Sequence, residues 1–257
     1  MLGWAPELKN EIADAIHTGF LKALDWVYPP VCAGCQTPGF HLCPNCEAQI
    51  HFITGNRCLV CGGAVSRQKL VCRHCRENPP PYTAMRNLAI YEGVIRECVH
   101  ALKYENNQSL VILFTKWLTA VVEKEGWEVE MVLAVPLSAQ RQRERGYNQA
   151  ARIAKPLARH LGVRYNPFGL KRIRNTVSQV GLSGDVRRQN VAGAFEALPE
   201  MVGGKKILLV DDVMTTGSTL EACSKALRES GADAIYCLTI ARFAIHHPGS
   251  FSARNQV

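Results

Sequence analysis

The chain has 257 residues, of which 47% are hydrophobic and 20% charged, a composition typical of a globular protein with a sizeable core. No apolar run approaches the roughly 18 residues that a membrane span needs. Acidic residues near the N-terminus interrupt any secretory signal, so we expect a cytoplasmic protein that is not inserted in a membrane.

The formal net charge of +8 is unevenly distributed. The segment from Ser138 to Asn190 carries twelve Lys or Arg residues against Glu144 and Asp185, a local net charge of +10. Such an excess is either a solvated basic face or a surface that attracts a polyanion. A sugar bearing a pyrophosphate and a nucleic acid would both qualify as that polyanion.

The N-terminal segment, residues 1–28, is predicted to be an amphipathic helix. Between residues 7 and 24 an apolar side chain recurs at every fourth position, which is the period of one helix face. We expect this helix to pack against the rest of the protein or against a partner, without a catalytic role.

Eight of the eleven cysteines form four CxxC pairs within a small predicted domain, residues 29–80. Paired CxxC turns hold tetrahedral zinc through four thiolates, which leave no open position for catalysis. Repetition of the motif argues against a redox dithiol, and the missing secretion signal argues against disulfides. We therefore expect two structural Zn²⁺ ions, with sequential pairing favoured over crossed pairing. The predicted ligands are Cys32, Cys35, Cys43 and Cys46 for one ion, and Cys58, Cys61, Cys72 and Cys75 for the other.

The remaining chain, residues 81–257, alternates predicted strands and helices. Residues 131–136 form an apolar run without alternation, as expected of a strand covered on both faces. Ligands of open α/β sheets bind beyond the carboxyl ends of their strands. The basic residues that follow this strand should therefore face the same crevice as residues beyond the strand predicted at 207–210.

The stretch from 205 to 227 combines that strand, two acids, a loop of small residues and a helix from residue 220. Backbone N–H groups and the positive end of a helix make such a loop an anion cradle. Asp211 and Asp212 cannot bind the anion but suit hydroxyl groups or a Mg²⁺ ion that the anion shares. The alternative interpretation is an ordinary turn in which Asp and Thr cap the helix.

The order of these residues resembles the signature of type I phosphoribosyltransferases, which bind 5-phosphoribosyl 1-pyrophosphate (PRPP). The resemblance implies that Asp211 and Asp212 contact the ribose hydroxyls. It also implies that the 5′-phosphate, with Mg²⁺ accompanying PRPP, is held by Thr215, Thr216, Gly217, Ser218 and Thr219.

The whole chain resembles the ComF/GntX family of bacterial, competence-associated phosphoribosyltransferase-like proteins. The resemblance rests on the CxxC repeats, ALKY at 101–104, VPL at 135–137, RQRERGYNQA at 141–150 and NVAGAF at 190–195. It implies an α/β fold with a mostly parallel sheet flanked by helices and a small zinc-ribbon domain. It also implies a role in DNA uptake, in transformation or in the use of imported DNA.

In these enzymes the turn after VPL binds pyrophosphate, and a second segment closes over the sugar as a lid. This chain has Ser138, Ala139 and Gln140 where family members often carry a basic or proline pair, so the nearby arginines would compensate. The residues assigned to pyrophosphate and lid are Leu137, Ser138, Arg141, Arg143, Arg145, Arg172, Thr176, Gln179 and Arg187.

Three functions remain open from the sequence. A phosphoribosyltransferase would displace pyrophosphate from PRPP, with Asp211 and Asp212 orienting the sugar. A non-catalytic PRPP sensor would bind PRPP without turnover and act through DNA-uptake proteins. A single-stranded DNA binder would use the zinc module and the basic stretch, and its affinity would fall steeply with salt.

Overall fold

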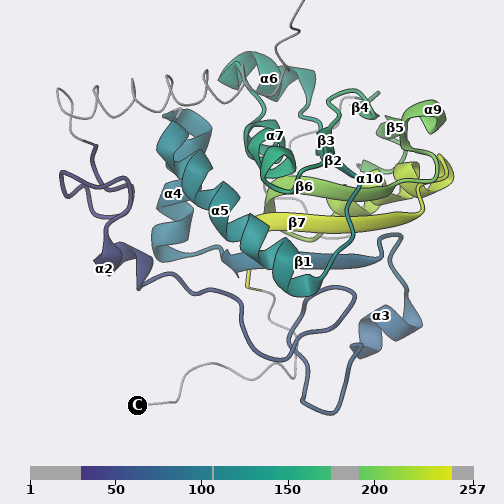
Figure 1. Cartoon of the computed structure of the whole chain (residues 1–257), viewed down its shortest axis with the longest axis horizontal. Helices are drawn as coiled ribbons and strands as arrows, with labels where there is room; N and C mark the ends of the chain where they lie inside the picture. The colour runs from purple at the N-terminus through teal and green to yellow at the C-terminus, as the bar shows by residue number, and fades with distance from the viewer. Residues whose placement is uncertain (1–29, 106, 175–190, 245–257) are drawn as a thin grey trace, which may run out of the picture. The chain divides into compact units, whose positions relative to one another are not determined.

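The computed structural model describes residues 30–105, 107–174 and 191–244 (Figure 1). These residues fall into two compact units, which divide between Gln49 and Ile50. The helix predicted for residues 7–24 and the lid residues Thr176, Gln179 and Arg187 lie outside the described ranges. The predicted boundary after residue 80 separates domains that would fold independently, and it stays a prediction.

A five-stranded parallel sheet forms the centre of the larger unit, with strand order β1-β7-β6-β2-β3 (Figure 1). Its neighbours pair in parallel register, so Val210 of β6 lies opposite both Ala134 of β2 and Leu238 of β7. The predicted parallel α/β class is confirmed. The strands are β1 Ala84–Ile90, β2 Met131–Ala134, β3 Arg164–Tyr165, β6 Lys206–Met214 and β7 Ala234–Arg242.

Helices cover both faces of this sheet. One face carries α4 (Gly93–Tyr104), α5 (Gln108–Glu125) and α7 (Gln149–His160), with α5 and α7 packed side by side (Figure 1). The other face carries α10 (Ser218–Glu229), next to the antiparallel pair of β4 (Leu170–Arg172) and β5 (Phe195–Ala197). None of the helices in the described ranges is both long enough and apolar enough to cross a membrane. The short helices are α2 Pro44–Glu47, α3 Arg73–Glu77, α6 Ala139–Arg145 and α9 Pro199–Val202.

Strand β6 is apolar on both faces, which explains its central place. Ile207 and Leu209 join the core cluster that includes Leu227 of α10. Side chains alternate along a strand, so Leu208 and Val210 point to the opposite face, where α7 packs. All four side chains from 207 to 210 are fully buried, as expected of a parallel strand covered by helices on both sides.

The edge strand β1 is covered by the segment that carries the second cysteine quartet. Backbone hydrogen bonds join Ile53 N–H to Leu88 O at 2.9 Å and Met85 N–H to Val60 O at 2.6 Å. A Cβ atom on Gly62 would lie 2.7 Å from Met85 O, so only glycine permits this close approach. The covering segment removes unpaired backbone groups that an exposed edge strand would present.

A buried ion network reinforces the same junction. The guanidinium group of Arg86 pairs with Glu125 of α5 and donates a hydrogen bond to Leu59 O at 3.1 Å. The second carboxylate oxygen of Glu125 pairs with Arg57 at 3.1 Å. The side chains of Arg86 and Glu125 are only 4% and 14% exposed, so their charges interact with little screening by water.

We predict that Glu125→Gln destabilises the larger unit by about 3 kcal/mol, because it leaves two largely buried guanidinium groups without their counter-ion. Urea unfolding followed by circular dichroism measures this loss. Glu123→Gln makes the same chemical change at an exposed position of α5 and should change the free energy of unfolding by less than about 0.5 kcal/mol. Equal effects of the two substitutions would contradict a stabilising role for the buried network.

Candidate functional site

The acidic pair lies inside strand β6, not beyond its end. The prediction that the strand stops at Val210 was wrong, because β6 continues to Met214 and its pairing with β7 extends to Met214 opposite Arg242. Alternation along the strand therefore sends the side chains of Asp211 and Asp212 to opposite faces of the sheet.

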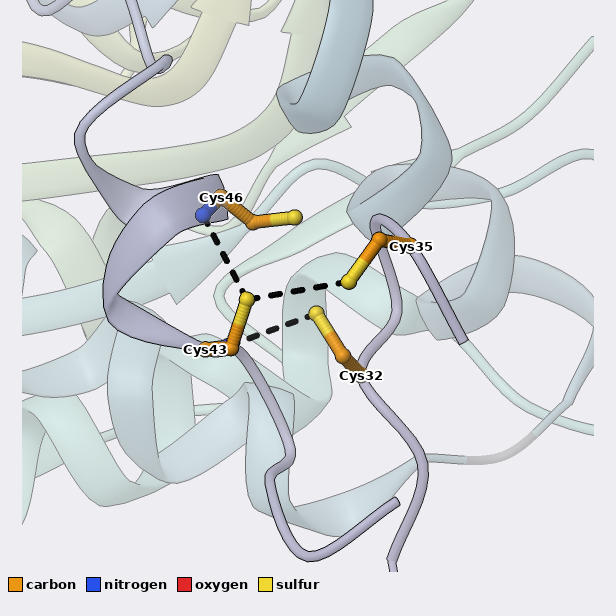
Figure 2. Close-up of side chains that lie close together, drawn as sticks. All are labelled: Cys32, Cys35, Cys43 and Cys46. Carbon is orange, nitrogen blue, oxygen red and sulfur yellow. Dashed lines mark hydrogen bonds between the residues drawn. The ribbon is translucent and has the colours of Figure 1, made fainter. Parts of the chain in front are cut away.

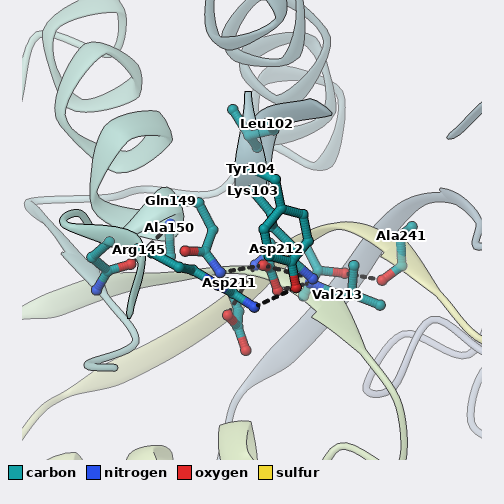
Figure 3. Close-up of polar contacts among 12 residues, drawn as sticks. Leu102, Lys103, Tyr104, Arg145, Gln149, Ala150, Asp211, Asp212, Val213 and Ala241 are labelled. Carbon is teal, nitrogen blue, oxygen red and sulfur yellow. Dashed lines mark hydrogen bonds and ion pairs between the residues drawn. The ribbon is translucent and has the colours of Figure 1, made fainter. Parts of the chain in front are cut away.

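Asp212 is held by two residues from the helices on the α4/α7 face (Figure 3). Its Oδ2 atom lies 3.1 Å from Lys103 Nζ of α4 and accepts a hydrogen bond of 2.7 Å from Gln149 Nε2 of α7. Asp212 is a buried carboxylate, and the ammonium group compensates for the hydration that the carboxylate loses. Asp212 is therefore fixed in position before any ligand arrives.

Asp211 points away from Lys103 and Gln149, toward the α10 face (Figure 3). Its Oδ1 atom accepts a hydrogen bond of 2.9 Å from the backbone N–H of Asp212. Burial, and then the neighbouring Asp212 carboxylate, raise the pKa of Asp211 above its ordinary value. A carboxylate in such surroundings gains from a cation or a hydroxyl donor brought by a ligand.

The predicted phosphate loop connects β6 to the first turn of α10. Gly217 has φ of +85° and serves as the N-cap of this helix, a backbone conformation that favours glycine. The hydroxyl groups of Thr216 and Ser218 lie 2.8 Å apart. The Ser218 N–H donates to Thr216 Oγ1 at 3.4 Å. The first backbone N–H groups of α10 have no acceptor within their own helix, which is the arrangement by which a helix N-terminus can bind an anion.

The turn after β2 forms the second wall of the site. Ser138 caps α6, with its Oγ accepting a hydrogen bond of 3.3 Å from the backbone N–H of Arg141. The guanidinium group of Arg145 lies 5.2 Å from the ring centre of Tyr104 and donates a hydrogen bond of 3.3 Å to its hydroxyl. Arg172 comes from β4; burial, and to a smaller extent the positive charge of Arg141, lower its pKa.

The residues from Gly146 to Gln149 tie this turn to the carboxylates. Gly146 ends α6, the Tyr147 hydroxyl donates to Leu102 O at 2.8 Å, and Asn148 caps α7 while donating to Val135 O at 2.9 Å. Gln149 follows and reaches Asp212. Four consecutive residues thus set the position of the basic turn relative to β6.

These walls enclose a cavity of about 620 Å³. Both carboxylates line it, together with most of the other described residues predicted for the site. Arg143, Thr216 and Ser218 do not line it, and Arg143 is exposed. The predicted residues in the lining are Leu137, Ser138, Arg141, Arg145, Arg172, Asp211, Asp212, Thr215, Gly217 and Thr219.

Two buried polar atoms at the cavity lack a hydrogen-bond partner among the described residues. They are Arg145 Nη1 and Gln149 Oε1, and both residues line the cavity. Buried polar groups are rarely left unpaired in native proteins, so each such atom needs an explanation. Both atoms are closed to solvent, so a ligand could pair with them only after the side chains of Arg145 and Gln149 turn toward the cavity.

The first cysteine quartet has the geometry of a tetrahedral metal site (Figure 2). The sulfur atoms of Cys32, Cys35, Cys43 and Cys46 all lie within 4.8 Å of one another and point toward a common centre. Cys35 and Cys43 Sγ are 3.7 Å apart, close to the edge of about 3.8 Å of a tetrahedron with zinc–sulfur bonds of about 2.3 Å. Although burial opposes it, backbone N–H donors lower the pKa of Cys32 to about 6.

The second quartet repeats this arrangement inside the larger unit. Cys61 and Cys72 Sγ are 3.8 Å apart, and backbone N–H groups donate to the sulfur atoms of Cys58 and Cys72. The cysteines group in sequence order, as the sequential pairing predicts. Both quartets fit Zn²⁺ in donor type, number and spacing.

Two models of known protein families match the chain. The double zinc ribbon domain matches residues 23–76, and the phosphoribosyl transferase domain matches residues 148–247. The "DNA utilization protein YhgH" of an Escherichia coli O6:H1 strain is 30% identical over 188 residues, covering 70% of this chain and 82% of that protein. The chain belongs to the ComF/GntX family.

Two further similarities are a sequence relative and a solved structure. "Competence protein F" of Haemophilus influenzae, a relative, is 31% identical over 208 residues, covering 78% of this chain and 90% of its own length. Among solved structures, the glutamine PRPP amidotransferase of Bacillus subtilis with ADP and GMP is 21% identical. That overlay has a TM-score of 0.37 and covers 55% of this chain and 30% of the amidotransferase.

Two residues of the site had a sequence signal that was not used to predict them. Lys103 and Gln149 were not assigned a role, although they lie in the ALKY and RQRERGYNQA motifs that carry the family resemblance. Their meeting at Asp212 depends on the packing of α4 and α7, which no local pattern encodes. Tyr91, Tyr104, Glu144 and Phe243 also line the cavity and were not predicted.

We predict two bound zinc ions per chain, with different consequences for their loss. Cys32→Ser and Cys58→Ser should each remove one zinc equivalent, because each deletes one of four thiolates. Only Cys58→Ser should destabilise the larger unit, since its quartet belongs to that unit and Arg86 bonds to its backbone. Zinc is measured with a colorimetric chelator after denaturation, and stability by urea unfolding. Equal destabilisation by the two variants would refute this difference.

Proposed function

We propose that this chain binds PRPP in the cavity between β6, α10 and the turn after β2. The observation that carries the proposal is that one cavity is lined by two carboxylates, a small-residue loop at a helix N-terminus and three arginines. PRPP has three matching parts: ribose hydroxyls, a 5′-phosphate and a pyrophosphate.

Each part of PRPP has a group of suitable chemistry within the cavity. Asp211 and Asp212 accept hydrogen bonds from the ribose hydroxyls, and the loop from Thr215 to Thr219 donates to the 5′-phosphate. Arg141, Arg145 and Arg172 line the cavity, and their positive charges attract the pyrophosphate. Carboxylate and phosphate oxygens are the donor set that Mg²⁺ prefers, so PRPP would bring this ion to the site.

The same arrangement supports transfer of the phosphoribosyl group. When the bond between C1 and pyrophosphate breaks, the bonding electron pair leaves with the pyrophosphate and positive charge develops on the ribose. The arginines stabilise the departing anion, and a bound Mg²⁺ would neutralise part of its charge. Asp212, held by Lys103 and Gln149, fixes the orientation of the sugar during this step.

The family relatives are named for DNA utilization and competence. These names support the proposal that PRPP chemistry in this chain serves the use of imported DNA. Release of pyrophosphate in the presence of an acceptor would identify a transferase. PRPP binding without release would identify a non-catalytic sensor.

We predict that the double variant Asp211→Asn/Asp212→Asn weakens Mg²⁺–PRPP binding by about 100-fold or more. It removes two charged acceptors of hydrogen bonds, each worth roughly 1.5–3 kcal/mol. Isothermal titration calorimetry measures the affinity of the zinc-loaded protein. Asp233→Asn changes an exposed carboxylate outside the cavity and should keep wild-type affinity.

Two results would count against the proposed site. The first is a wild-type chain, folded and loaded with two zinc ions, that shows no heat of PRPP binding. The second is a double variant that binds as tightly as the Asp233→Asn control.

A further inference from the structure

Two aromatic rings stand at the carboxyl ends of neighbouring strands and line the cavity. Tyr91 directly follows β1 and Phe243 directly follows β7. Their ring centres are 4.7 Å apart and their planes are inclined by 35°. Backbone hydrogen bonds fix both positions, from Tyr91 N–H to Arg242 O at 2.7 Å and from Phe243 N–H to Met214 O at 3.0 Å.

This pair adds aromatic surface to a cavity that also holds carboxylate and guanidinium groups. Phe243 is 45% exposed, although a phenyl ring gains free energy from burial. Tyr104 lines the same cavity, but the guanidinium group of Arg145 already lies over its ring. Ribose, phosphate and pyrophosphate offer no flat apolar face, so PRPP alone gives the rings of Tyr91 and Phe243 nothing to stack against.

The sheet order places this pair at the opposite end of the cavity from the basic turn. β7 and β1 lie on one side of β6, and β2 with its turn lies on the other side. The carboxylates of β6 and the loop after it lie between the two ends. A ribose bound over β6 with its pyrophosphate toward Arg141 would therefore have its remaining side toward Tyr91 and Phe243.

We propose that Tyr91 and Phe243 form a platform on which a planar nitrogen heterocycle, such as a nucleobase, stacks while its ribose 5-phosphate occupies the loop and the carboxylates. This inference rests on the proposed function and adds the class of the second ligand. Stacking of a base on aromatic side chains tolerates different bases, because every base has a flat π-face. In a displacement at C1, an acceptor enters opposite the leaving group, which is the side where these rings lie.

The experiment compares the affinities of ribose 5-phosphate and two nucleoside monophosphates, AMP and CMP, for the zinc-loaded full chain. These ligands share the sugar phosphate, so the ratio of their dissociation constants isolates the base. We expect AMP to bind roughly ten-fold more tightly than ribose 5-phosphate, and CMP by a smaller factor. In Phe243→Leu and Tyr91→Leu this ratio should fall toward one.

Phe168→Leu is the matched control, because Phe168 is 62% exposed and does not line the cavity. It should keep the wild-type ratio. Equal affinities of AMP and ribose 5-phosphate for the wild-type chain would overturn the platform, and so would a ratio that survives both substitutions.

The outcomes also separate this inference from the proposed function. Binding of ribose 5-phosphate without any gain from the base overturns the platform and leaves the PRPP site in place. Binding of AMP that is lost in Phe243→Leu, without binding of ribose 5-phosphate or PRPP, supports the platform and overturns the PRPP site. If none of these ligands binds, both proposals fail.

Discussion

The central constraint in this structure is the alternation of side chains along β6. Its residues from 207 to 210 are buried on both faces, and Asp211 and Asp212 follow them within the same strand, so their side chains must point in opposite directions. A carboxylate at such a position loses hydration and needs compensation from nearby groups. Asp212 receives it from Lys103, Gln149 and the backbone N–H of Val213, whereas Asp211 accepts a hydrogen bond from the backbone N–H of Asp212. The two acids are therefore unequal, one fixed by the fold and the other open to a ligand.

The compensation at Asp212 links the helices of one face to the chemistry of the site. Lys103 lies in the last turn of α4 and Gln149 begins α7, so both helices must dock correctly before the carboxylate is held. Tyr147 bonds to the backbone of α4, and Asn148 joins the start of α7 to the backbone just after β2, the strand that the basic turn follows. The position of the arginines and the position of the carboxylates are thus set by one group of contacts. This coupling accounts for a run of specific residues from 146 to 149 in a segment that contributes little to the hydrophobic core.

The sequence revealed the parts of the site that are local and missed those that depend on packing. The cysteine quartets and the loop from 215 to 219 are contiguous patterns with their own geometry. The end of β6 was misplaced because aspartate is depleted in strands, whereas pairing with β7 overrides that preference here. Lys103 meets a residue 109 positions away, as its ion pair with Asp212 shows, and Tyr91 and Phe243 meet only because β1 and β7 are neighbours in the sheet. Such contacts depend on which strands are neighbours in the sheet. The alternation of strands and helices predicts a parallel α/β fold but does not predict the order of its strands.

The strand order also determines which groups lie at each end of the cavity. The basic turn follows β2 on one side of β6, and the aromatic pair follows β7 and β1 on the other. A small ligand with only anionic groups would need the basic side alone, and a hydrophobic ligand would need the aromatic side alone. The carboxylates between them suit a ligand whose hydroxyls lie between an anionic end and a flat end. A ribose 5-phosphate has its hydroxyls in the middle. During the proposed reaction it has pyrophosphate, the anionic group, on one side and a planar base on the other. The second quartet contributes to this arrangement at a distance, because the segment that carries it covers β1, the strand that ends at Tyr91.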